Sequence, residues 1–368
     1  MAILGQKASV LANADDQYHR IQEAVFHFSR GNLISAKRLL LRFPYINVSH
    51  SSLDLKSFLF LKALWLRFEE EFDHEGNIYL KSFSTRQIDI FNLMATRMPL
   101  VSQTAATANT LLTWLVDVHD EVTLLDIGVG TGRQIVSLLE QISILRPIHT
   151  KIKIVGVEPS ASSLELAQSN ILTKAAHLGL NIEFKPVLAL AENLTAADWS
   201  KHTNGAEALL INEAFALHHI RSSEKKNEVL EHLAGLRPVG FILSEPHSNH
   251  TSDDLVLRFN QAWHHYGLVF NVIDQQPLSQ LERDAMKIHF FAREIEDVIG
   301  MPEDSRTERH ELADMWLHRL NRAGFSTLDC ASSLAGGTTE GIQCSWERDH
   351  LSFSYRRQPI VSLMAVTS

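Results

Sequence analysis

The spacing of apolar residues divides the chain into a helical first part and an alternating second part. From residue 15 to residue 118, apolar residues recur at intervals of three and four, which is typical of amphipathic helices. We interpret the aromatic residues of this region as packing residues, because a stripe at helical spacing is more often core than binding surface. We expect helices in the stretches 21–44, 52–72, 85–99 and 104–120.

From residue 121 onward, short β-rich runs alternate with helical ones. The runs are almost continuously apolar, as are strands of a parallel sheet that helices cover on both faces. They lie at 122–129, 152–158, 182–189, 207–214 and 240–246. The stretch 253–323 is again helical in pattern. A last group of β-rich runs lies at 325–331, 341–347 and 351–357. It indicates that the α/β sheet ends in antiparallel strands.

The composition is that of an ordinary globular chain. The 368 residues, 45% apolar and 21% charged, fit one elaborated domain or two domains. A net charge of −9 argues against a broad electrostatic surface for nucleic acid or an anionic membrane. No apolar run approaches the ~20 residues that cross a bilayer. With only two cysteines and no signal-peptide pattern at the start, we expect a cytoplasmic protein.

The stretch 124–134, LLDIGVGTGRQ, places three alternating glycines between a predicted strand and a predicted helix. Glycines let the backbone approach a ligand, and a helix N-terminus offers free N–H groups to an anion. A dinucleotide fingerprint, G-x-G-x-x-G, would require glycine where Arg133 stands. The spacing D-x-G-x-G-x-G instead resembles the first motif of class I S-adenosylmethionine-dependent methyltransferases. This resemblance implies S-adenosylmethionine, with its product S-adenosylhomocysteine, as the cofactor.

Further residues extend this resemblance. Glu158 ends the next predicted strand, where a carboxylate can accept hydrogen bonds from both ribose hydroxyls. The stretch 207–220, EALLINEAFALHHI, is similar to the fourth-strand segment of the same methyltransferases. Near the adenine such enzymes often carry an acidic residue, whereas this chain has Leu190 with Glu192 close by. The cofactor-binding residues that the resemblance implies are Asp126, Gly128, Gly130, Gly132, Glu158, Asn193 and Asn212.

Over roughly residues 80–357, the order of motifs is similar to that of the GRAS family, known mainly as plant regulators. The glycine stretch resembles the family's VHIID-type motif, and TAATANTLLTWL before it resembles a leucine-rich helix. The stretch 306–325 carries the elements R-x-E-R-H-E, W-x-x-R and A-G-F. SWERDHLSFSYR stands where the family ends in its SAW motif, with Tyr355 in place of the usual tryptophan. Plant members generally lack the full glycine set, which is present here.

The resemblance implies a Rossmann-like methyltransferase core with an α-helical cap. We expect a mostly parallel sheet of seven to eight strands with an antiparallel terminal hairpin. The expected division is a helical region at 1–118 that forms most of the cap, a first core part at 119–250, a cap insertion at 251–310 and a last core part at 311–368.

Methyl transfer requires a positioned donor, an in-line acceptor and sometimes a base. At the expected strand ends we identify His218, Glu245 and His250 as candidate catalytic residues. His218 and His219 are adjacent and should point in different directions, so one of them caps or packs. We assign His247 and Arg309 to substrate contacts in the cap. The His-x-x-His at 247–250 lacks the further ligands of a metal site, so we expect no metal.

The segment 306–310 is strongly charged and precedes a predicted helix. A capping and ion-pair network and a lining of the cap's cavity are both compatible with it.

Two functions from different classes are compatible with the chain. One is a methyltransferase acting on a small molecule held between core and cap, which the intact glycine set favours. The other is a non-catalytic GRAS-type scaffold or transcriptional regulator that acts through protein partners. We expect a small-molecule substrate, no membrane insertion and no direct nucleic-acid binding, while a protein partner and a homodimer both stay open.

Overall fold

The computed structural model describes residues 2–43, 54–68, 86–145 and 151–368. Parts of the predicted helices 21–44, 52–72 and 85–99 lie outside these residues. Within them, the first part of the chain is helical, as predicted. Its helices are α1 (Ala2–Ser29), α2 (Leu33–Leu40), α3 (Leu55–Leu66), α4 (Gln87–Arg97) and α5 (Pro99–Asp117).

A single mixed sheet of ten described strands forms the centre of the fold. Its order is β3-β2-β1-β4-β5-β10-β9-β8-β7, with β6 pairing with β10. The first five strands are parallel and β10, β9 and β8 are antiparallel, which confirms the Rossmann-like fold. The strands are β1 (Glu121–Ile127), β2 (Lys151–Glu158), β3 (Ile182–Leu188), β4 (Ala208–Ala214), β5 (Gly240–Pro246), β6 (Ser326–Thr327), β7 (Thr338–Thr339), β8 (Ile342–Glu347), β9 (His350–Tyr355) and β10 (Gln358–Thr367).

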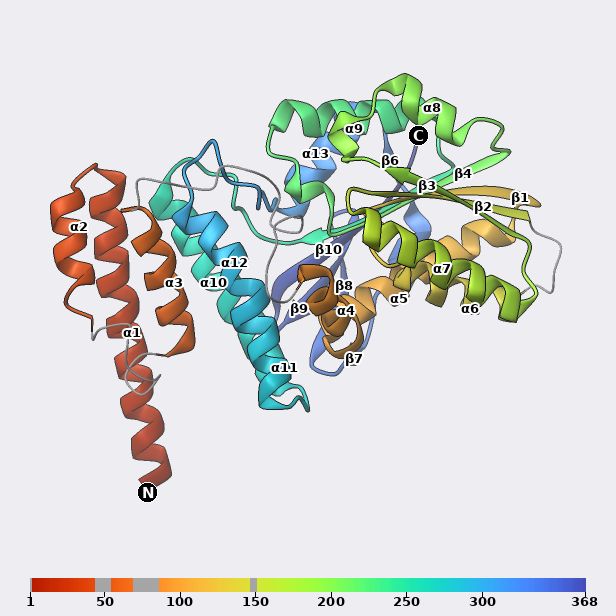
Figure 1. The fold of residues 1–368 in the computed structure, drawn as a ribbon. Helices are drawn as coiled ribbons and strands as arrows, with labels where there is room; N and C mark the ends of the chain where they lie inside the picture. The colour runs from red at the N-terminus through yellow and green to blue at the C-terminus, as the bar shows by residue number, and fades with distance from the viewer. Residues whose placement is uncertain (1, 44–53, 69–85, 146–150) are drawn as a thin grey trace.

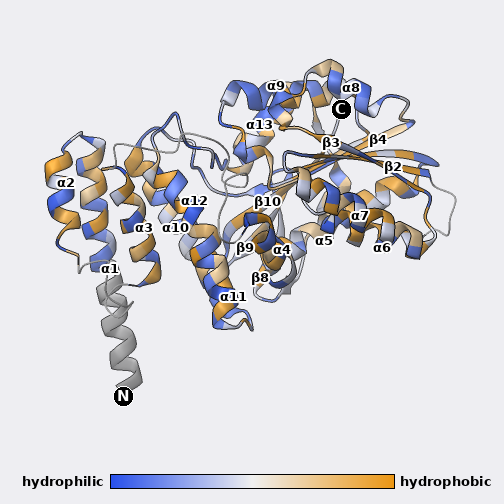
Figure 2. Cartoon of the chain, viewed as in Figure 1, coloured by the Kyte–Doolittle hydropathy of each residue, from blue (hydrophilic) through white to orange (hydrophobic). Residues whose placement is uncertain are grey.

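Helices cover both faces of the sheet because the apolar residues of each strand alternate between two separate cores. In β1, Leu124 packs into the core on one face and Leu125 into the core on the other. The first core includes α5, α6 (Arg133–Leu145) and α7 (Ala161–Leu178). The second includes α8 (Ala196–Thr203), α9 (Ser223–Gly235) and α13 (Ala313–Ala323). These helices carry both apolar and polar residues, as expected for helices with one buried face (Figure 2).

A group of helices lies beside the sheet, and we call this group the cap (Figure 1). In it, α1 and α3 pack against α10 (Leu255–Gln275). Tyr18 in α1 donates a 3.0 Å hydrogen bond to Asn260 in α10. A second, irregular helical stretch follows α10 and contains two segments of π-helix. Its parts are α11 (Gln280–Asp284), η3 (Ala285–Phe291), α12 (Ala292–Ile295) and η4 (Glu296–Gly300).

The segment 1–118 contributes to both parts of the molecule. Helices α1 to α3 belong to the cap, whereas α5 packs on β4, β5 and β10. Between them, α4 contacts both α5 and the π-helical segment η3 of the cap. Pro99 starts α5 without a backbone N–H, and the extended residue Met98 separates the two helices. The residues of α4 therefore lie where the cap meets the core.

The end of the chain differs from the prediction. The run 325–331 contributes only the two-residue strand β6, and the 3-10 helix η5 (Asp329–Leu334) follows it. Strand β10, which we did not predict, lies between β5 and β9 and is buried over most of its length. The expected hairpin of β8 and β9 is present, but β10 joins it to the parallel strands.

Candidate functional site

The glycine loop follows β1 at the point where the strand order reverses between β1 and β4. Such a switch point opens a crevice at the carboxyl ends of the strands. Gly128, Gly130 and Gly132 have φ angles of 78°, 53° and 76°. This left-handed region is costly for residues with a side chain, which explains the alternating glycines.

The three glycines have different surroundings. A Cβ on Gly128 would lie 2.6 Å from Cβ of Ala216, and one on Gly132 would lie 3.0 Å from the Ile171 side chain. Gly128 and Gly132 are therefore required for packing as well as for backbone conformation. A Cβ on Gly130 would meet only the flexible end of Ile88, at 3.3 Å, and the backbone oxygen of Gly128. Gly130 is the loop glycine that opens toward the crevice.

Glu158, at the end of β2, is tied directly to this loop. Its Oε2 accepts a 3.0 Å hydrogen bond from the backbone N–H of Gly130, and its Oε1 accepts one of 3.0 Å from the N–H of Ser160. Burial raises the pKa of this carboxyl above its usual value, against the opposing effect of the two N–H bonds. The carboxylate thus stands beside the loop with further lone pairs to offer.

Asp126 and Asn212 form a buried layer beneath the loop. Asn212 donates a 2.7 Å hydrogen bond to Asp126, and Gln134 donates one of 3.2 Å to Asn212. The pKa of Asp126 is raised to about 7, mainly by burial; the hydrogen bond from Asn212 opposes this rise and the nearby charge of Glu158 adds to it. Asn212 is fully buried, so it supports Asp126 from below.

A cavity of about 1150 Å³ lies over these groups. Of the seven predicted cofactor residues, Asp126, Gly128, Gly130 and Glu158 line it. Gly132, Asn193 and Asn212 are not among its lining residues. Glu192, next to Asn193 in the turn η1 (Ala191–Asn193), lines the cavity instead.

Apolar side chains from α4, α5 and the end of β4 also line the cavity, among polar ones. Ile88, Phe91 and Val101 line it together with Phe215. The rings of Phe91 and Phe215 are 6.1 Å apart, and Phe215 has a φ of 58°. Sequence reasoning missed these residues, because a helical aromatic such as Phe91 carries no local signal that separates a cavity wall from core.

The polar end of the cavity differs from the one we predicted. His219, Ser244 and Thr307 line it, whereas His218, Glu245 and His250 do not. Ser244 is buried at the end of β5, and its hydroxyl has no hydrogen-bond partner among the residues that the structure describes. Of the adjacent histidines in η2 (Leu217–His219), it is His219 that reaches the cavity.

The structure brings His218 and Glu245 together behind this wall. Nδ1 of His218 lies 2.5 Å from Oε2 of Glu245, and the His218 backbone N–H donates a 2.9 Å bond to Oε1. Burial raises the pKa of Glu245 to about 7. His250 is also buried, bonded to Ser248 at 2.9 Å and stacked on the ring of His310. The candidate catalytic residues therefore form a buried polar layer rather than a cavity surface.

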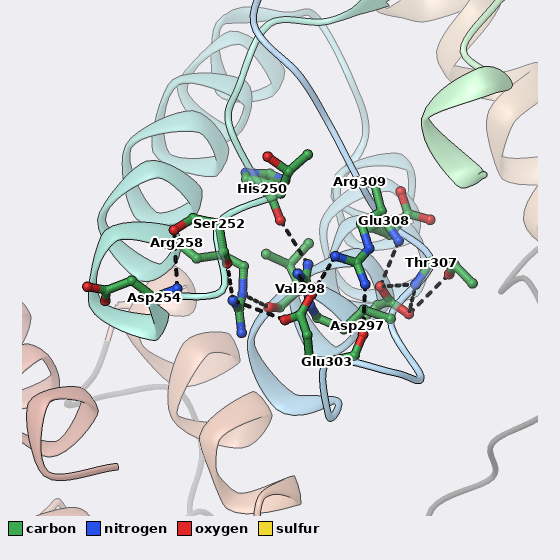
Figure 3. A network of polar contacts seen from close by, with 12 residues as sticks. His250, Ser252, Asp254, Arg258, Asp297, Val298, Glu303, Thr307, Glu308 and Arg309 are labelled. Carbon is green, nitrogen blue, oxygen red and sulfur yellow. Dashed lines mark hydrogen bonds and ion pairs between the residues drawn. The ribbon is translucent and has the colours of Figure 1, made fainter. Parts of the chain in front are cut away.

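The two predicted cap residues also take structural positions. His247 Nδ1 lies 2.8 Å from the Ser362 hydroxyl, and burial lowers its pKa to about 4, with a further contribution from His350. Arg309 bonds to the side chain and the backbone of Glu303 (Figure 3). Neither residue lines the cavity.

The charged segment 306–310 forms an ion-pair network where the cap insertion returns to the core. Arg306 donates to both carboxylate oxygens of Glu303, and to the carbonyl of His250 at 2.8 Å. Asp297 accepts hydrogen bonds from the backbone N–H groups of Thr307 and Glu308 (Figure 3). The sequence left open whether this segment forms a capping and ion-pair network or lines the cavity. Most of the segment forms the network, and Thr307 is its one residue that also lines the cavity.

The comparison with known families agrees with this architecture. The model of the GRAS domain family matches residues 19–342. The chain belongs to the GRAS family. The crystal structure of SCL7 from Oryza sativa superposes with a TM-score of 0.73, covering 94% of this chain and 99% of that one. At 21% identity, this similarity shows a shared fold.

Curated relatives of the chain include GRAS proteins of plants. GRAS family protein RAD1 of Lotus japonicus is 29% identical over 207 residues, which is 55% of this chain and 40% of the relative. Chitin-inducible gibberellin-responsive protein 2 of Oryza sativa is 27% identical over 274 residues, or 69% of this chain and 50% of the relative. This chain therefore spans half or less of the length of these two relatives. None of its described helices is long and apolar enough to cross a membrane.

Proposed function

We propose that this GRAS chain binds S-adenosylmethionine in the cavity and transfers a methyl group to a small, largely apolar acceptor. The observation that carries the proposal is the pair formed by Gly130 and Glu158. The open glycine and the carboxylate are joined by a hydrogen bond and both line the cavity. A bare strand-to-helix turn needs no such partner.

The residues present fit the cofactor. Glu158 supports ribose binding, because a carboxylate can accept from two neighbouring hydroxyls. Gly130 supports close approach of the ligand to the backbone, since it has no side chain to fill the space. Glu192 lines the cavity after β3 and could accept from the exocyclic amine of adenine. The cofactor would supply a methyl group on a sulfonium centre.

The acceptor end is supported by the apolar side chains that line the cavity and the polar groups beside them. Phe91 and Phe215 offer ring faces to a flat or apolar molecule. The Ser244 hydroxyl can orient a polar group of the acceptor, because it is buried and has no partner among the described residues. His219 is the ionisable group of this end that we propose to take a proton from the acceptor.

Calorimetric titration of the folded protein with S-adenosylmethionine and S-adenosylhomocysteine tests the cofactor step. One site per chain is expected, and the absence of any heat of binding would contradict the proposal. Transfer is tested by supplying methyl-labelled cofactor with pooled small metabolites and searching for labelled products by mass spectrometry.

The second candidate is a regulator that binds the cofactor without transferring its methyl group, or that acts with the cavity empty. Names of relatives favour it, among them Scarecrow-like transcription factor PAT1 of Arabidopsis thaliana, 25% identical over 220 residues. Cofactor binding without any labelled product, together with a partner whose affinity changes with the cofactor, would support this candidate over the methyltransferase.

A further inference from the structure

Three buried side chains from two segments meet behind the polar end of the cavity. His218 belongs to η2 after β4, whereas Glu308 and His310 belong to the segment that follows the cap insertion. One potential ligand atom from each residue lies within 4.8 Å of the other two. Their side chains are 3%, 0% and 2% exposed.

We propose that His218, Glu308 and His310 bind a divalent transition-metal ion of the zinc class. Two imidazoles and one carboxylate form a ligand set that suits zinc and the neighbouring late metals. The site is distinct from the cofactor cavity, and it uses neither His247 nor the His-x-x-His spacing that the sequence presents. It does not depend on the proposed methyl transfer.

The distances within the cluster favour a metal over direct hydrogen bonds. Nε2 of His218 and Nε2 of His310 each lie 3.3 Å from Oε2 of Glu308. Hydrogen bonds between an imidazolium and a carboxylate are shorter, about 2.7–2.9 Å. Ligand atoms bound at about 2.0–2.1 Å around a tetrahedral zinc ion stand about 3.3 Å from one another. The two measured separations match an edge of that tetrahedron.

The other nitrogen of His218 supports the same assignment. Nδ1 lies 2.5 Å from the Glu245 carboxylate, and we assign to this nitrogen the proton of the contact. In the neutral ring Nε2 then offers a lone pair, and it faces the carboxylate of Glu308. Two acceptors that face each other repel unless a proton or a metal ion lies between them, and we assign the metal ion. A histidine held by a carboxylate through one nitrogen while the other binds metal is the usual arrangement in protein metal sites.

The charge around Glu308 also needs a cation. Its side chain is fully buried, and no lysine or arginine of the described residues forms an ion pair with it. The arginines on either side, Arg306 and Arg309, pair with Glu303 instead. The partners of Glu308 are His218, His219 and His310. If these rings are neutral, the buried carboxylate has no compensating charge, which is costly, and a divalent ion would offset both Glu308 and Glu245.

The position of the site links it to the cavity. His219 and Thr307 are the chain neighbours of His218 and Glu308, and both line the cavity. Nδ1 of His219 lies 3.1 Å from Oε1 of Glu308, so the carboxylate of the cluster also contacts a histidine that lines the cavity. A bound ion would therefore fix the wall that the acceptor contacts, by joining the end of β4 to the segment after the cap insertion.

The test uses the full chain without an affinity tag, stripped with a chelator and titrated with Zn²⁺ and Co²⁺ in the absence of cofactor. We expect one equivalent of metal per chain, a visible absorption band of four-coordinate Co²⁺ that Zn²⁺ displaces, and a rise in Tm. His218→Gln and His310→Gln should each weaken binding by about 100-fold or more, and Glu245→Gln by about 10- to 100-fold. His350→Gln, a buried histidine outside the cluster, should bind as wild type does.

Wild-type protein that takes up no stoichiometric metal would overturn the proposal, and so would unchanged binding in both histidine variants. Should those variants fail to fold, the Co²⁺ spectrum of the wild type decides. A four-coordinate spectrum without thiolate charge transfer supports the site, whereas a weak six-coordinate spectrum contradicts it. Because cofactor is absent throughout, the result is independent of the proposed methyltransferase function.

Discussion

The backbone N–H of Gly130 donates a 3.0 Å hydrogen bond to the carboxylate of Glu158, which lies 28 residues further along the chain. The bond joins the loop after β1 to the end of β2, two strands that are paired in parallel register. Because Glu158 also accepts from Ser160, both carboxylate oxygens are held in place. Under the proposed function, this fixed carboxylate is the group that would accept hydrogen bonds from the ribose hydroxyls.

Gly130→Trp should abolish binding of S-adenosylhomocysteine. The new side chain would start beside Ile88 and extend into the cavity, because nothing else but the Gly128 carbonyl lies within 4 Å of its Cβ. We expect affinity to fall by about 100-fold or more, since the indole would occupy the ligand's space. Calorimetry on folded protein measures the change.

Gly179→Trp is the matched control for this substitution. Gly179 also has a left-handed backbone, with φ at 67°, but it caps α7 in open space away from the cavity. Both variants should carry a similar strain of about 1–3 kcal/mol, and only Gly130→Trp should lose the ligand. Equal affinities in the two variants would mean that the pocket lies elsewhere.

Glu158→Gln should weaken the same ligand by about 10- to 100-fold, because a neutral amide replaces a charged acceptor of two hydroxyl groups. The affinity of wild type should also depend on pH. Burial raises the pKa of Glu158, so affinity should be greatest above that raised pKa and fall as pH is lowered through it. The glutamine variant should lack this fall, and a wild-type affinity that stays constant down to pH 4 would argue against ribose binding by the carboxylate.

Asp126→Asn should stabilise the fold at high pH. The pKa of Asp126 is about 7 in the folded protein and 3.8 in an unperturbed chain, so between these values the folded state holds a proton that the unfolded state releases. Wild-type stability should therefore fall as pH rises from about 4 to about 7, by an amount on the order of 4 kcal/mol. Asparagine can still accept from Asn212 and should remove this slope.

Urea unfolding of wild type and Asp126→Asn at pH 5, 6, 7 and 8 measures the effect. The two curves of unfolding free energy against pH should move apart as the pH rises above 5, and the variant should be the more stable protein at pH 8. Parallel curves would show that Asp126 ionises in the folded state as easily as in the unfolded one.

The parallel strands and the glycine loop could be predicted because each has a local signal. An almost continuous apolar run such as 207–214 predicts a strand that is buried on both faces, and β4 lies there. Strand β10 is as apolar as the others, but nothing local shows that a final strand inserts between β5 and β9. That position follows from long-range pairing, which a run of apolar residues cannot specify.

The site was predictable only in part for a similar reason. Glu158 and Gly130 stand at ends of predicted elements, so their meeting follows from the parallel sheet. His218 and His219 are identical in type and adjacent, and their directions depend on the short 3-10 turn η2. Glu308 is buried against histidines while Glu303 forms ion pairs with Arg306 and Arg309, the two arginines near Glu308. Which acidic residue pairs with which arginine is decided by the packing of the folded chain, so the sequence alone does not show it.

The segment 306–310, which carries Glu308 and His310, is anchored by the residue that follows it, Glu311. Its carboxylate lies 2.8 Å from Nζ of Lys226 in α9 and 2.7 Å from Nε of Arg319 in α13, and the lysine and glutamate side chains are only 2% and 1% exposed. Glu311→Gln should lower the free energy of unfolding by about 3–5 kcal/mol, because it leaves a buried ammonium group without a counter-charge.

Lys226→Met should cost clearly less, about 1–2 kcal/mol, since Glu311 keeps Arg319 and the methionine can pack on Trp316, over whose ring the lysine now lies. The exposed neighbour Lys225, which pairs with Glu228 at the surface, serves as the control. Lys225→Met should change stability by less than about 0.5 kcal/mol. Urea unfolding of the three variants measures the order, and a larger loss for Lys226→Met than for Glu311→Gln would mean that the lysine, and not the carboxylate, holds the segment in place.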